Sequence, residues 1–325
     1  MNAGRVVVLR ALGLGDLLTA VPALRGLRRA FPLAEIALAA PATLGPLALL
    51  SGAVDRVVDT ALVAPLSGPV PPLDPSLAGA DVAVNLHGRG PQSTALLAAT
   101  GPRRLIAYDA RPGAPEWRPD EHEVGRWCRL LAESGIAADP EDLDLLPPSV
   151  PSPAPGAVVL HPGAGSGSRR WPAERWALVA GAIAATGRRV VVTGGAAEAG
   201  LVAQVVDAAG LPPESLLVGR TDVLELAALV AAASQVLCGD TGIGHLATAY
   251  RTPSVLLFGP TPPALWGPPQ RPQHVVLWSG RRGDPHGTGP DRGLLDITVD
   301  QVLAAIVAIR ERLRVLGTGI RPSIG

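Results

Sequence analysis

The sequence contains no lysine, so all 28 of its basic residues are arginines, and 28 acidic residues balance them to a formal net charge of zero. A nucleic-acid-binding surface normally shows a basic excess, so this balance argues against a nucleic-acid partner. The Walker A pattern GxxxxGK[ST] is excluded because it requires a lysine. Any side-chain cation that binds a phosphate in this protein must therefore be an arginine.

Cysteine is scarce as well. Cys128 and Cys238 lie far apart, with no CxxC spacing and no cluster of histidines and cysteines, so we expect no bound metal and a reducing compartment. The N-terminal apolar run VVVL is too short for a signal peptide or a membrane span. We therefore expect a cytoplasmic protein whose contact with a membrane would be peripheral, at its inner face.

Aromatic residues make up only 3% of the chain, whereas hydrophobic residues make up 47%. The core must therefore consist of alanine, valine and leucine, as in helices packed on parallel strands. A chain of 325 residues is about twice the usual size of one domain. Composition and length together predict two domains of the α/β class.

Short apolar runs alternate with stretches long enough for helices. The first half offers four strand candidates, residues 5–10, 35–39, 81–85 and 104–108. The second half offers five, residues 157–161, 188–193, 215–218, 235–238 and 254–258, with helices at 173–185 and from 196 and 223. This alternation predicts parallel sheets with right-handed crossovers.

Prolines mark the boundary between the two series. The segment from Leu145 to Gly156 reads LLPPSVPSPAPG, and its five prolines exclude a helix or a central strand and favour a stiff connector. We place the domain boundary at residue 150. After Gly259 the chain becomes rich in glycine and proline, and residues 279–293 are expected to be exposed and mobile. The pattern of residues 299–313 predicts a final amphipathic helix, which could pack back on the first domain.

The first candidate site is the turn from Gly13 to Asp16, which reads GLGD between a strand and its helix. Glycines allow a sharp turn close to a ligand, and the helix N-terminus offers free N–H groups. Asp16 is compatible with two roles. It could cap the helix, or it could act in a site, because sites in open α/β sheets lie at the carboxyl ends of strands.

The second candidate is the segment HPGAGSGSRRWP, residues 161–172, which again follows a strand. Its small residues, with Ser166 and Ser168 among them, could supply donors for a phosphate, and Arg169 could supply a charge-assisted bond. The alternative is a loop with solvated arginines.

The third candidate is GDTGIGH, residues 239–245, which opens a helix. One turn presents Asp240, Thr241 and His245 together, and the backbone N–H groups from Thr241 to Gly244 could meet a diphosphate. In a further turn Glu198 is placed to accept hydrogen bonds from ribose hydroxyls. These turns follow neighbouring strands, so they predict one nucleotide diphosphate site.

Taken in order, the segments LRALGLGDLLTAVPALRGLRRAFP, HEVGRWCRLLAESGI, HPGAGSGSRRWP, GDTGIGHLATA and LFGPTPP resemble glycosyltransferase family 9, the heptosyltransferases. The resemblance implies the GT-B architecture, in which two Rossmann-like domains face a central cleft. Residues 1–150 would bind the acceptor, and residues 151–325 would bind the nucleotide sugar. No cofactor is implied, since the donor is itself a substrate.

The resemblance also assigns roles. Asp16 would be the general base of an inverting transfer, in which the acceptor hydroxyl displaces the diphosphate in one step. Arg169 matches a phosphate-binding lysine of the family, Glu198 matches the residue that binds the ribose, and Asp240, Thr241, Gly242 and His245 match the diphosphate signature. Contacts around Glu198 and Thr221 would select the base.

The implied donor is ADP-heptose, and the acceptor is a saccharide or glycolipid that would meet Gly15, His87 and Arg89. Two other functions stay open: a nucleotide-sugar epimerase of the same architecture, and a sugar-nucleotide-binding protein without catalysis. We expect a monomer.

Overall fold

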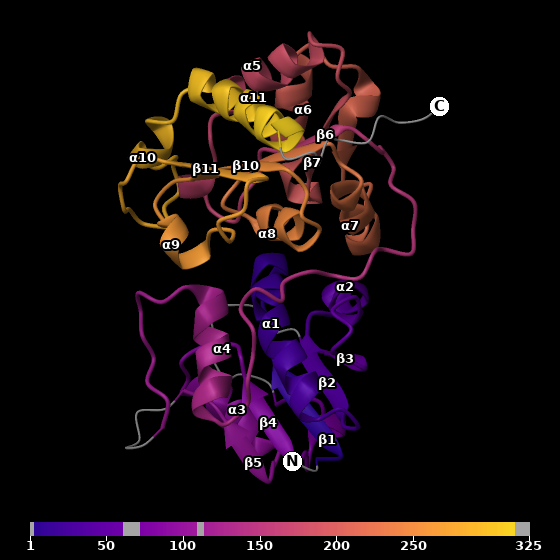
Figure 1. The fold of residues 1–325 in the computed structure, drawn as a ribbon, viewed down its shortest axis with the longest axis vertical. Coiled ribbons are helices and arrows are strands. Elements are labelled where there is room, and N and C mark those ends of the chain that lie inside the picture. Colours follow the sequence, from indigo (N-terminus) through magenta and orange to yellow (C-terminus); the bar gives the residue numbers. More distant parts are fainter. Residues whose placement is uncertain (1–2, 61–71, 109–113, 316–325) are drawn as a thin grey trace. The chain divides into compact units, whose positions relative to one another are not determined.

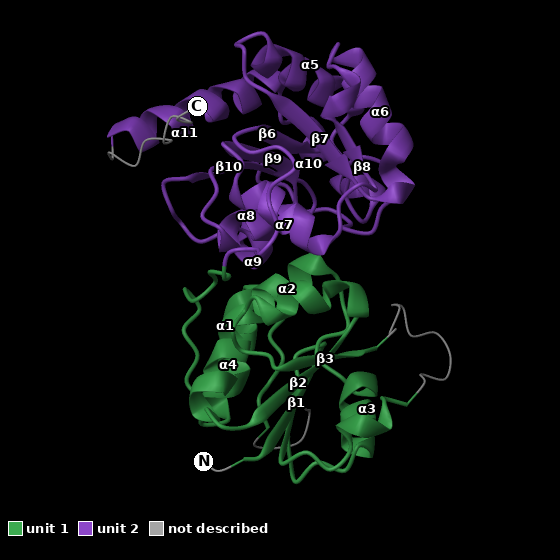
Figure 2. Cartoon of the chain, turned by 90° about the vertical axis from the view of Figure 1, so that its right-hand side faces the viewer, with its two compact units in different colours: residues 1–146 green, residues 147–325 purple. Residues whose placement is uncertain are grey.

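The protein is described here by a computed structural model that covers residues 3–60, 72–108 and 114–315 (Figure 1). The chain divides into two compact units, residues 1–146 and 147–325, which Figure 2 colours separately. The division follows Leu146, immediately before the first proline of the segment at which we placed the domain boundary.

The first unit is built on a five-stranded parallel sheet in the order β3-β2-β1-β4-β5. The strands are β1 (Arg5–Leu9), β2 (Glu35–Ala40), β3 (Arg56–Asp59), β4 (Val82–Asn85) and β5 (Arg104–Ile106). The apolar side chains of β1 from Val6 to Leu9 are fully buried, because helices cover both faces of a parallel sheet. The chain order reverses between β1 and β4, and this switch point is where such sheets bind ligands.

The described residues of the first unit also form four α-helices: α1 (Leu14–Ala30), α2 (Gly45–Leu49), α3 (Gln92–Ala99) and α4 (Glu123–Glu133). Helices α1 and α4 pack on each other. A Cβ atom at Gly26 of α1 would lie 2.8 Å from the carbonyl oxygen of Ala137 and 2.9 Å from the Cβ of Ala138. The segment that follows α4 therefore crosses α1 at a position that admits only glycine without a shift.

The second unit contains a six-stranded parallel sheet in the order β11-β10-β9-β6-β7-β8. The strands are β6 (Val158–His161), β7 (Val190–Gly194), β8 (Leu216–Val218), β9 (Gln235–Gly239), β10 (Ser254–Phe258) and β11 (His274–Trp278). From β8 the spatial order is that of the dinucleotide-binding fold, with its switch point between β6 and β9. The predicted α/β class with two parallel sheets is confirmed.

Seven helices among the described residues of the second unit complete the fold: α5 (Ala173–Ala184), α6 (Ala199–Ala208), α7 (Val223–Ala231), α8 (Gly242–Ala249), α9 (Pro263–Trp266), α10 (Arg292–Leu295) and α11 (Val299–Val315). The core is aliphatic except for a few large rings. Trp171 and Trp176 are each 1% exposed and meet edge to face, with ring centroids 4.9 Å apart.

Three features of the second unit bear on the sequence predictions. Strand β11 lies in a stretch expected to be loop; its apolar run HVVLW is flanked by segments rich in glycine and proline, and it is only partly buried at the sheet edge. Helix α11 buries its apolar face, including Val302, Ile306 and Ile309, on α5, β10 and β11, so that face is used within the second unit.

The third feature is the segment 279–293. It is mostly exposed, as expected, but it is not detached, because its backbone is bonded to the loop that follows β6. The carbonyl of Gly287 accepts from the N–H of Ser168 at 2.9 Å, and the N–H of Asp291 donates to the carbonyl of Ser168 at 3.2 Å.

Candidate functional site

The second unit brings two predicted loops together at its switch point. Strands β6 and β9 are adjacent and parallel, and His161 pairs with Cys238 in register. The loop 162–170 and the turn 240–241 therefore start side by side. This is the location at which the predicted phosphate-binding residues converge.

Helix α8 presents an open N-terminus there. Thr241 is the N-cap residue, but its side chain makes no capping hydrogen bond. The first N–H groups of a helix have no partner within the helix and carry a partial positive charge. The hydroxyl of Thr241 is buried and meets no nitrogen or oxygen partner among the described residues. Asp240, Thr241, Gly242 and His245 are thus assembled around a site suited to an anion.

Arg169 reaches this turn from the neighbouring loop. Its Nη1 donates to the backbone carbonyl of Asp240 at 3.2 Å and lies 3.8 Å from the Asp240 carboxylate. Burial raises the pKa of Asp240 to about 6, an increase that the charge of Arg169 opposes. The arginine side chain is 28% exposed, so it remains accessible to a ligand.

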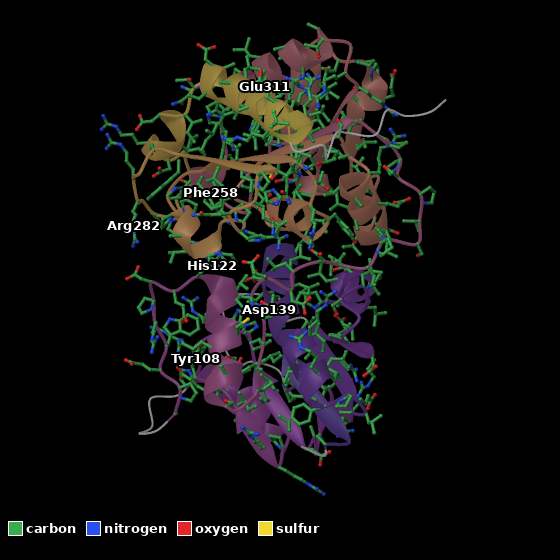
Figure 3. The ribbon with its side chains drawn as sticks, viewed as in Figure 1. Tyr108, His122, Asp139, Phe258, Arg282 and Glu311 are labelled. Carbon is green, nitrogen blue, oxygen red and sulfur yellow. The ribbon has the colours of Figure 1, made fainter. Side chains whose placement is uncertain are left out.

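A small pocket lies beside the first turn of α8. It is lined by Asp240, Thr241 and His245 and by apolar residues, among them Trp266 and Phe258. Phe258, the last residue of β10, is labelled in Figure 3. The His245 and Trp266 rings meet edge to face with centroids 6.0 Å apart. Trp266 was not anticipated as a site residue, because nothing in its local sequence links it to His245.

Ser166 and Ser168 are engaged within the protein. The Ser166 hydroxyl donates to the carbonyl of Pro285 at 2.6 Å and lies 3.1 Å from the Ser168 hydroxyl. It also accepts from Arg169 Nε at 3.3 Å. A Cβ atom at Gly167 would lie 1.7 Å from the carbonyl oxygen of Thr288, so that segment lies directly on the loop. In this conformation the two serines orient Arg169 and anchor residues 285–288.

Glu198 lies at the carboxyl ends of β6 and β7. Its carboxylate accepts from the N–H of Gly195 at 2.9 Å and lies 4.0 Å from His161 Nε2. A Cβ at Gly163 would overlap this carboxylate, which lies beneath the loop that follows β6. Burial lowers the pKa of His161, and the charge of Glu198 opposes this shift. Thr221 is half-buried, directly before the N-cap of α7.

Asp16 occupies a different helical position from the N-cap considered above. Gly13 is the N-cap of α1, and Asp16 is the third residue of the helix, where its Oδ2 accepts from the N–H of Gly13 at 3.2 Å. The other carboxylate oxygen, Oδ1, lies 3.3 Å from Nη2 of Arg10. The Asp16 side chain is 29% exposed, so a substrate can reach it.

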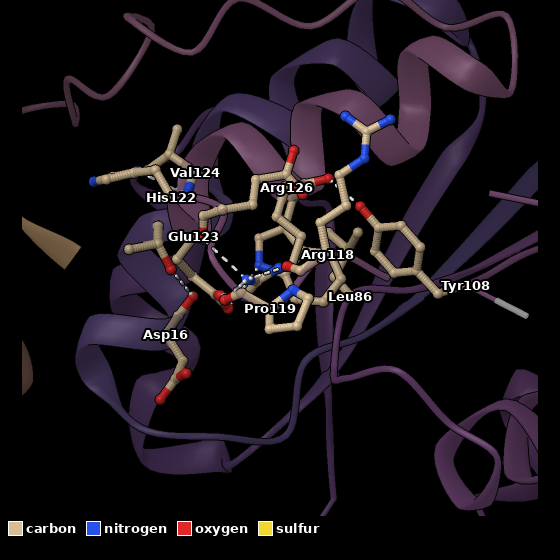
Figure 4. Close-up of polar contacts among 12 residues, drawn as sticks. Asp16, Leu86, Tyr108, Arg118, Pro119, His122, Glu123, Val124 and Arg126 are labelled. Carbon is tan, nitrogen blue, oxygen red and sulfur yellow. Dashed lines mark hydrogen bonds and ion pairs between the residues drawn. The ribbon is translucent and has the colours of Figure 1, made fainter. Parts of the chain in front are cut away.

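A buried ion-pair network supports Asp16 (Figure 4). Arg10 is 1% exposed, and its Nη2 also donates to Thr19 Oγ1 at 3.2 Å and to Glu123 Oε1 at 2.9 Å. Its Nε donates to the backbone carbonyl of Asp16 at 2.9 Å. The sequence drew attention to neither Arg10 nor Glu123. An arginine that ends a buried apolar strand was the available signal, since such a charge requires a partner.

The environment of Asp16 raises its pKa above the usual range. Burial is the largest cause, the charge of Arg10 opposes it, and the nearby charge of Glu123 adds to it. A raised pKa improves a carboxylate as a proton acceptor near neutral pH.

The three residues expected to meet an acceptor lie around the switch point of the first sheet. Gly15 is in the first turn of α1, and His87 and Arg89 follow β4, where Arg89 is exposed. The Nδ1 atom of His87 is buried and has no hydrogen-bond partner among residues 3–60, 72–108 and 114–315. Burial and then Arg10 lower the pKa of His87 to about 4, so the ring is neutral at physiological pH.

Among the described residues, no group of three or more His, Cys, Asp or Glu side chains is arranged to hold a metal ion. No helix in this part of the chain has the length and apolar character required to cross a membrane.

Comparison with known proteins indicates one family. The sequence model of glycosyltransferase family 9 (heptosyltransferase) matches residues 116–288, just over half of the chain. Lipooligosaccharide heptosyltransferase 2 of Haemophilus influenzae is 27% identical over 212 residues, covering 55% of this chain and 60% of the relative. Lipopolysaccharide heptosyltransferase 2 of Escherichia coli is 30% identical over 157 residues, covering 46% and 45%. The matches span about half the length of these curated relatives.

Solved structures extend the likeness of fold to nearly the whole chain. The ADP-heptose lipopolysaccharide heptosyltransferase II of Escherichia coli aligns with a TM-score of 0.76 at 21% identity, covering 96% of this chain and 99% of that one. An Escherichia coli heptosyltransferase with ADP aligns with a TM-score of 0.69 at 19% identity, covering 94% and 99%. The two parallel sheets thus match the fold of these GT-B heptosyltransferases.

Proposed function

Because the chain belongs to glycosyltransferase family 9, the heptosyltransferases, we propose that it transfers a sugar from a nucleotide sugar to a hydroxyl of a saccharide acceptor, with inversion. The observation that carries this proposal is the anion site at the switch point of the second sheet. There Arg169 is held against the Asp240 turn, next to the open N-terminus of α8.

The donor we propose is ADP-heptose. Its diphosphate would bind the first N–H groups of α8 and the Arg169 guanidinium, both of which favour negative charge. Gly242 allows the backbone to approach the diphosphate closely, and His245 would contact it one helical turn later. Glu198 would accept from the ribose, with Thr221 near the base. Two structural relatives are described as bound to ADP and to an ADP-heptose analogue, which supports this choice.

The proposed reaction is a single displacement. The acceptor oxygen attacks the anomeric carbon and transfers its proton to Asp16. The bond from that carbon to the diphosphate breaks, and ADP leaves with the electron pair. Arg169 and the N-terminus of α8 would stabilise the charge that develops on the leaving diphosphate. The carboxylate of Asp16 is partly exposed and its pKa is raised, and both properties suit a proton acceptor.

The acceptor would bind the first unit near Gly15, His87 and Arg89. The curated relatives are named for lipopolysaccharide or lipooligosaccharide, so we propose a saccharide or glycolipid of that kind. We also propose that the protein works as a monomer in the cytoplasm, with peripheral contact to the membrane that carries such an acceptor.

The donor site is tested by calorimetry with ADP, UDP, GDP and ADP-heptose. The Arg169→Ala and His245→Ala variants should each bind ADP about 10- to 100-fold more weakly, since a hydrogen bond to a charged group contributes about 1.5–3 kcal/mol. Arg314→Ala, on the exposed end of α11, is the matched control and should bind as the wild type does. Wild-type protein that binds none of these nucleotides would refute the proposal.

The catalytic role is tested separately with Asp16→Asn, which preserves the shape of the side chain. This variant should retain ADP binding but lose roughly 100- to 10,000-fold in transfer rate, the usual contribution of a general base. Transfer at the wild-type rate would exclude Asp16 as the base and leave the donor site standing.

A further inference from the structure

Glu123 is the most heavily bonded buried carboxylate near Asp16, and the proposed reaction does not use it. It is the first residue of α4 and is 4% exposed. Its Oε1 accepts from Arg10 Nη2 and from Trp127 Nε1, each at 2.9 Å, and its Oε2 accepts from Arg126 Nη1. Three donors therefore hold this carboxylate in one position at the N-terminus of α4.

Arg10 connects this carboxylate to Asp16. One guanidinium nitrogen, Nη2, contacts both carboxylates, at 2.9 Å to Glu123 and 3.3 Å to Asp16. The guanidinium also lies over the Trp127 ring, 4.8 Å from its centroid, and donates to the carbonyl of Leu86. These contacts hold the Arg10 guanidinium in one position, and the guanidinium in turn holds Oδ1 of Asp16.

The charges of this cluster balance. Two cations, Arg10 and Arg126, face two carboxylates, Asp16 and Glu123, in surroundings that exclude most water. Two histidines lie close to this cluster: His87, which is neutral at physiological pH, and His122, the N-cap of α4. Without Glu123, the full charge of Arg10 would act on Asp16 and make it a weaker proton acceptor. Without Arg10, Asp16 would lose its anchor and its counter-charge.

We propose that Glu123 is a positioning residue for Asp16: it holds Arg10 against the Asp16 carboxylate and offsets the charge of Arg10, so that Asp16 remains both ionised and able to accept a proton. This inference rests on the proposed role of Asp16 as the base. It adds a residue of α4 that contacts no reacting atom but determines the position of the base and how readily the base accepts a proton.

The direct test is a carbon-13 NMR titration of the Asp16 carboxyl in the full chain, with Asp16→Asn to assign the signal. Glu123→Gln should lower the pKa of Asp16 by about one unit or more, and Arg10→Gln should raise it by a similar amount, the size expected for a nearby charge. Thr19→Val removes an uncharged contact of Arg10 and should leave the pKa almost unchanged. Near-UV circular dichroism checks that each variant is folded, and Arg10→Lys replaces Arg10→Gln if that variant unfolds; its pKa should stay near the wild-type value.

The opposite signs of the two shifts make the test decisive. An unchanged pKa in Glu123→Gln, or shifts of the same sign in both variants, would overturn the inference. The titration needs no substrate, so its outcome is independent of whether the protein binds ADP.

Activity supplies a second readout where transfer is measurable. In Glu123→Gln the acid limb of the kcat/KM profile should move to lower pH by about one unit, and the maximal rate should fall because the base is weaker. A purely structural role would lower thermal stability and leave the acid limb in place, and that result would refute the positioning role.

Discussion

Replacing Asp240 with asparagine is expected to stabilise the protein at alkaline pH. The carboxyl is 8% exposed, and its pKa is about 6 in the folded protein against an ordinary value of 3.8. Between these pH values the folded state retains a proton that the unfolded chain releases. Wild-type stability attributable to Asp240 therefore falls as pH rises through this window, and it is lowest above about pH 6.

The magnitude follows from the pKa difference. The difference between 3.8 and about 6 corresponds to about 3 kcal/mol at 1.36 kcal/mol per unit, taken as an upper value. Asparagine avoids this cost but leaves Arg169 without its carboxylate neighbour, although the bond from Arg169 to the backbone carbonyl at 3.2 Å remains. We expect Asp240→Asn to gain about 1–3 kcal/mol at about pH 8 and to gain little at about pH 4.

Urea unfolding followed by tryptophan fluorescence at about pH 4, 6 and 8 measures this difference. The comparison of variant with wild type cancels every group that the two share. Asp207→Asn, at an exposed position of α6, is the matched control and should change stability equally at each pH. A stability difference for Asp240→Asn that stays constant across the range would refute the reasoning, because it would mean that Asp240 ionises normally.

Three further predictions concern packing. Gly26→Ala should lower the free energy of unfolding by about 1–3 kcal/mol, because the added methyl group overlaps the segment after α4. Gly125→Ala, at a position of α4 with open space around it, should raise the free energy of unfolding by up to about 1 kcal/mol. Urea unfolding compares the two variants. Gly167→Ala should displace residues 285–288 and so speed tryptic cleavage of this segment, which arginines flank, several-fold. Gly289→Ala is the control, because a methyl group there meets open space, and trypsin should cleave it at the wild-type rate. Trp176→Ala should cost about 3–5 kcal/mol by leaving a cavity in the core, and an unchanged Tm would contradict that placement.

The α/β class and most strands could be predicted from the sequence. Buried parallel strands require continuous apolar runs, and the turns that follow them require small residues, so both signals are local. Strands β3 and β11 were missed because each lies at a sheet edge and is only partly buried; β3 is also short, and β11 stands between glycine- and proline-rich segments. An edge strand faces fewer neighbours, so its sequence is less constrained.

The candidate site could be predicted in part. Asp16 and the residues from Asp240 to His245 stand in compact motifs after predicted strands, and parallel topology places such turns at one edge of each sheet. Their electrostatic properties could not be predicted, because these depend on burial and on partners. The raised pKa of Asp16 is one example, since it reflects burial first, and then the opposing charges of Arg10 and of Glu123 on another helix.

Partners distant in the chain were decided by the tertiary structure alone. Arg10 and Glu123 are 113 residues apart, and Ser166 and Pro285 are 119 apart, yet each pair is hydrogen-bonded. The sequence predicted that the hydroxyls of Ser166 and Ser168 could bind a ligand, whereas in the folded chain the segment 285–288 packs on them. The sequence by itself determined the elements and the turns, since these depend on neighbouring residues. Only the folded chain determined which charges meet, because a buried charge is stable only where packing delivers its partner.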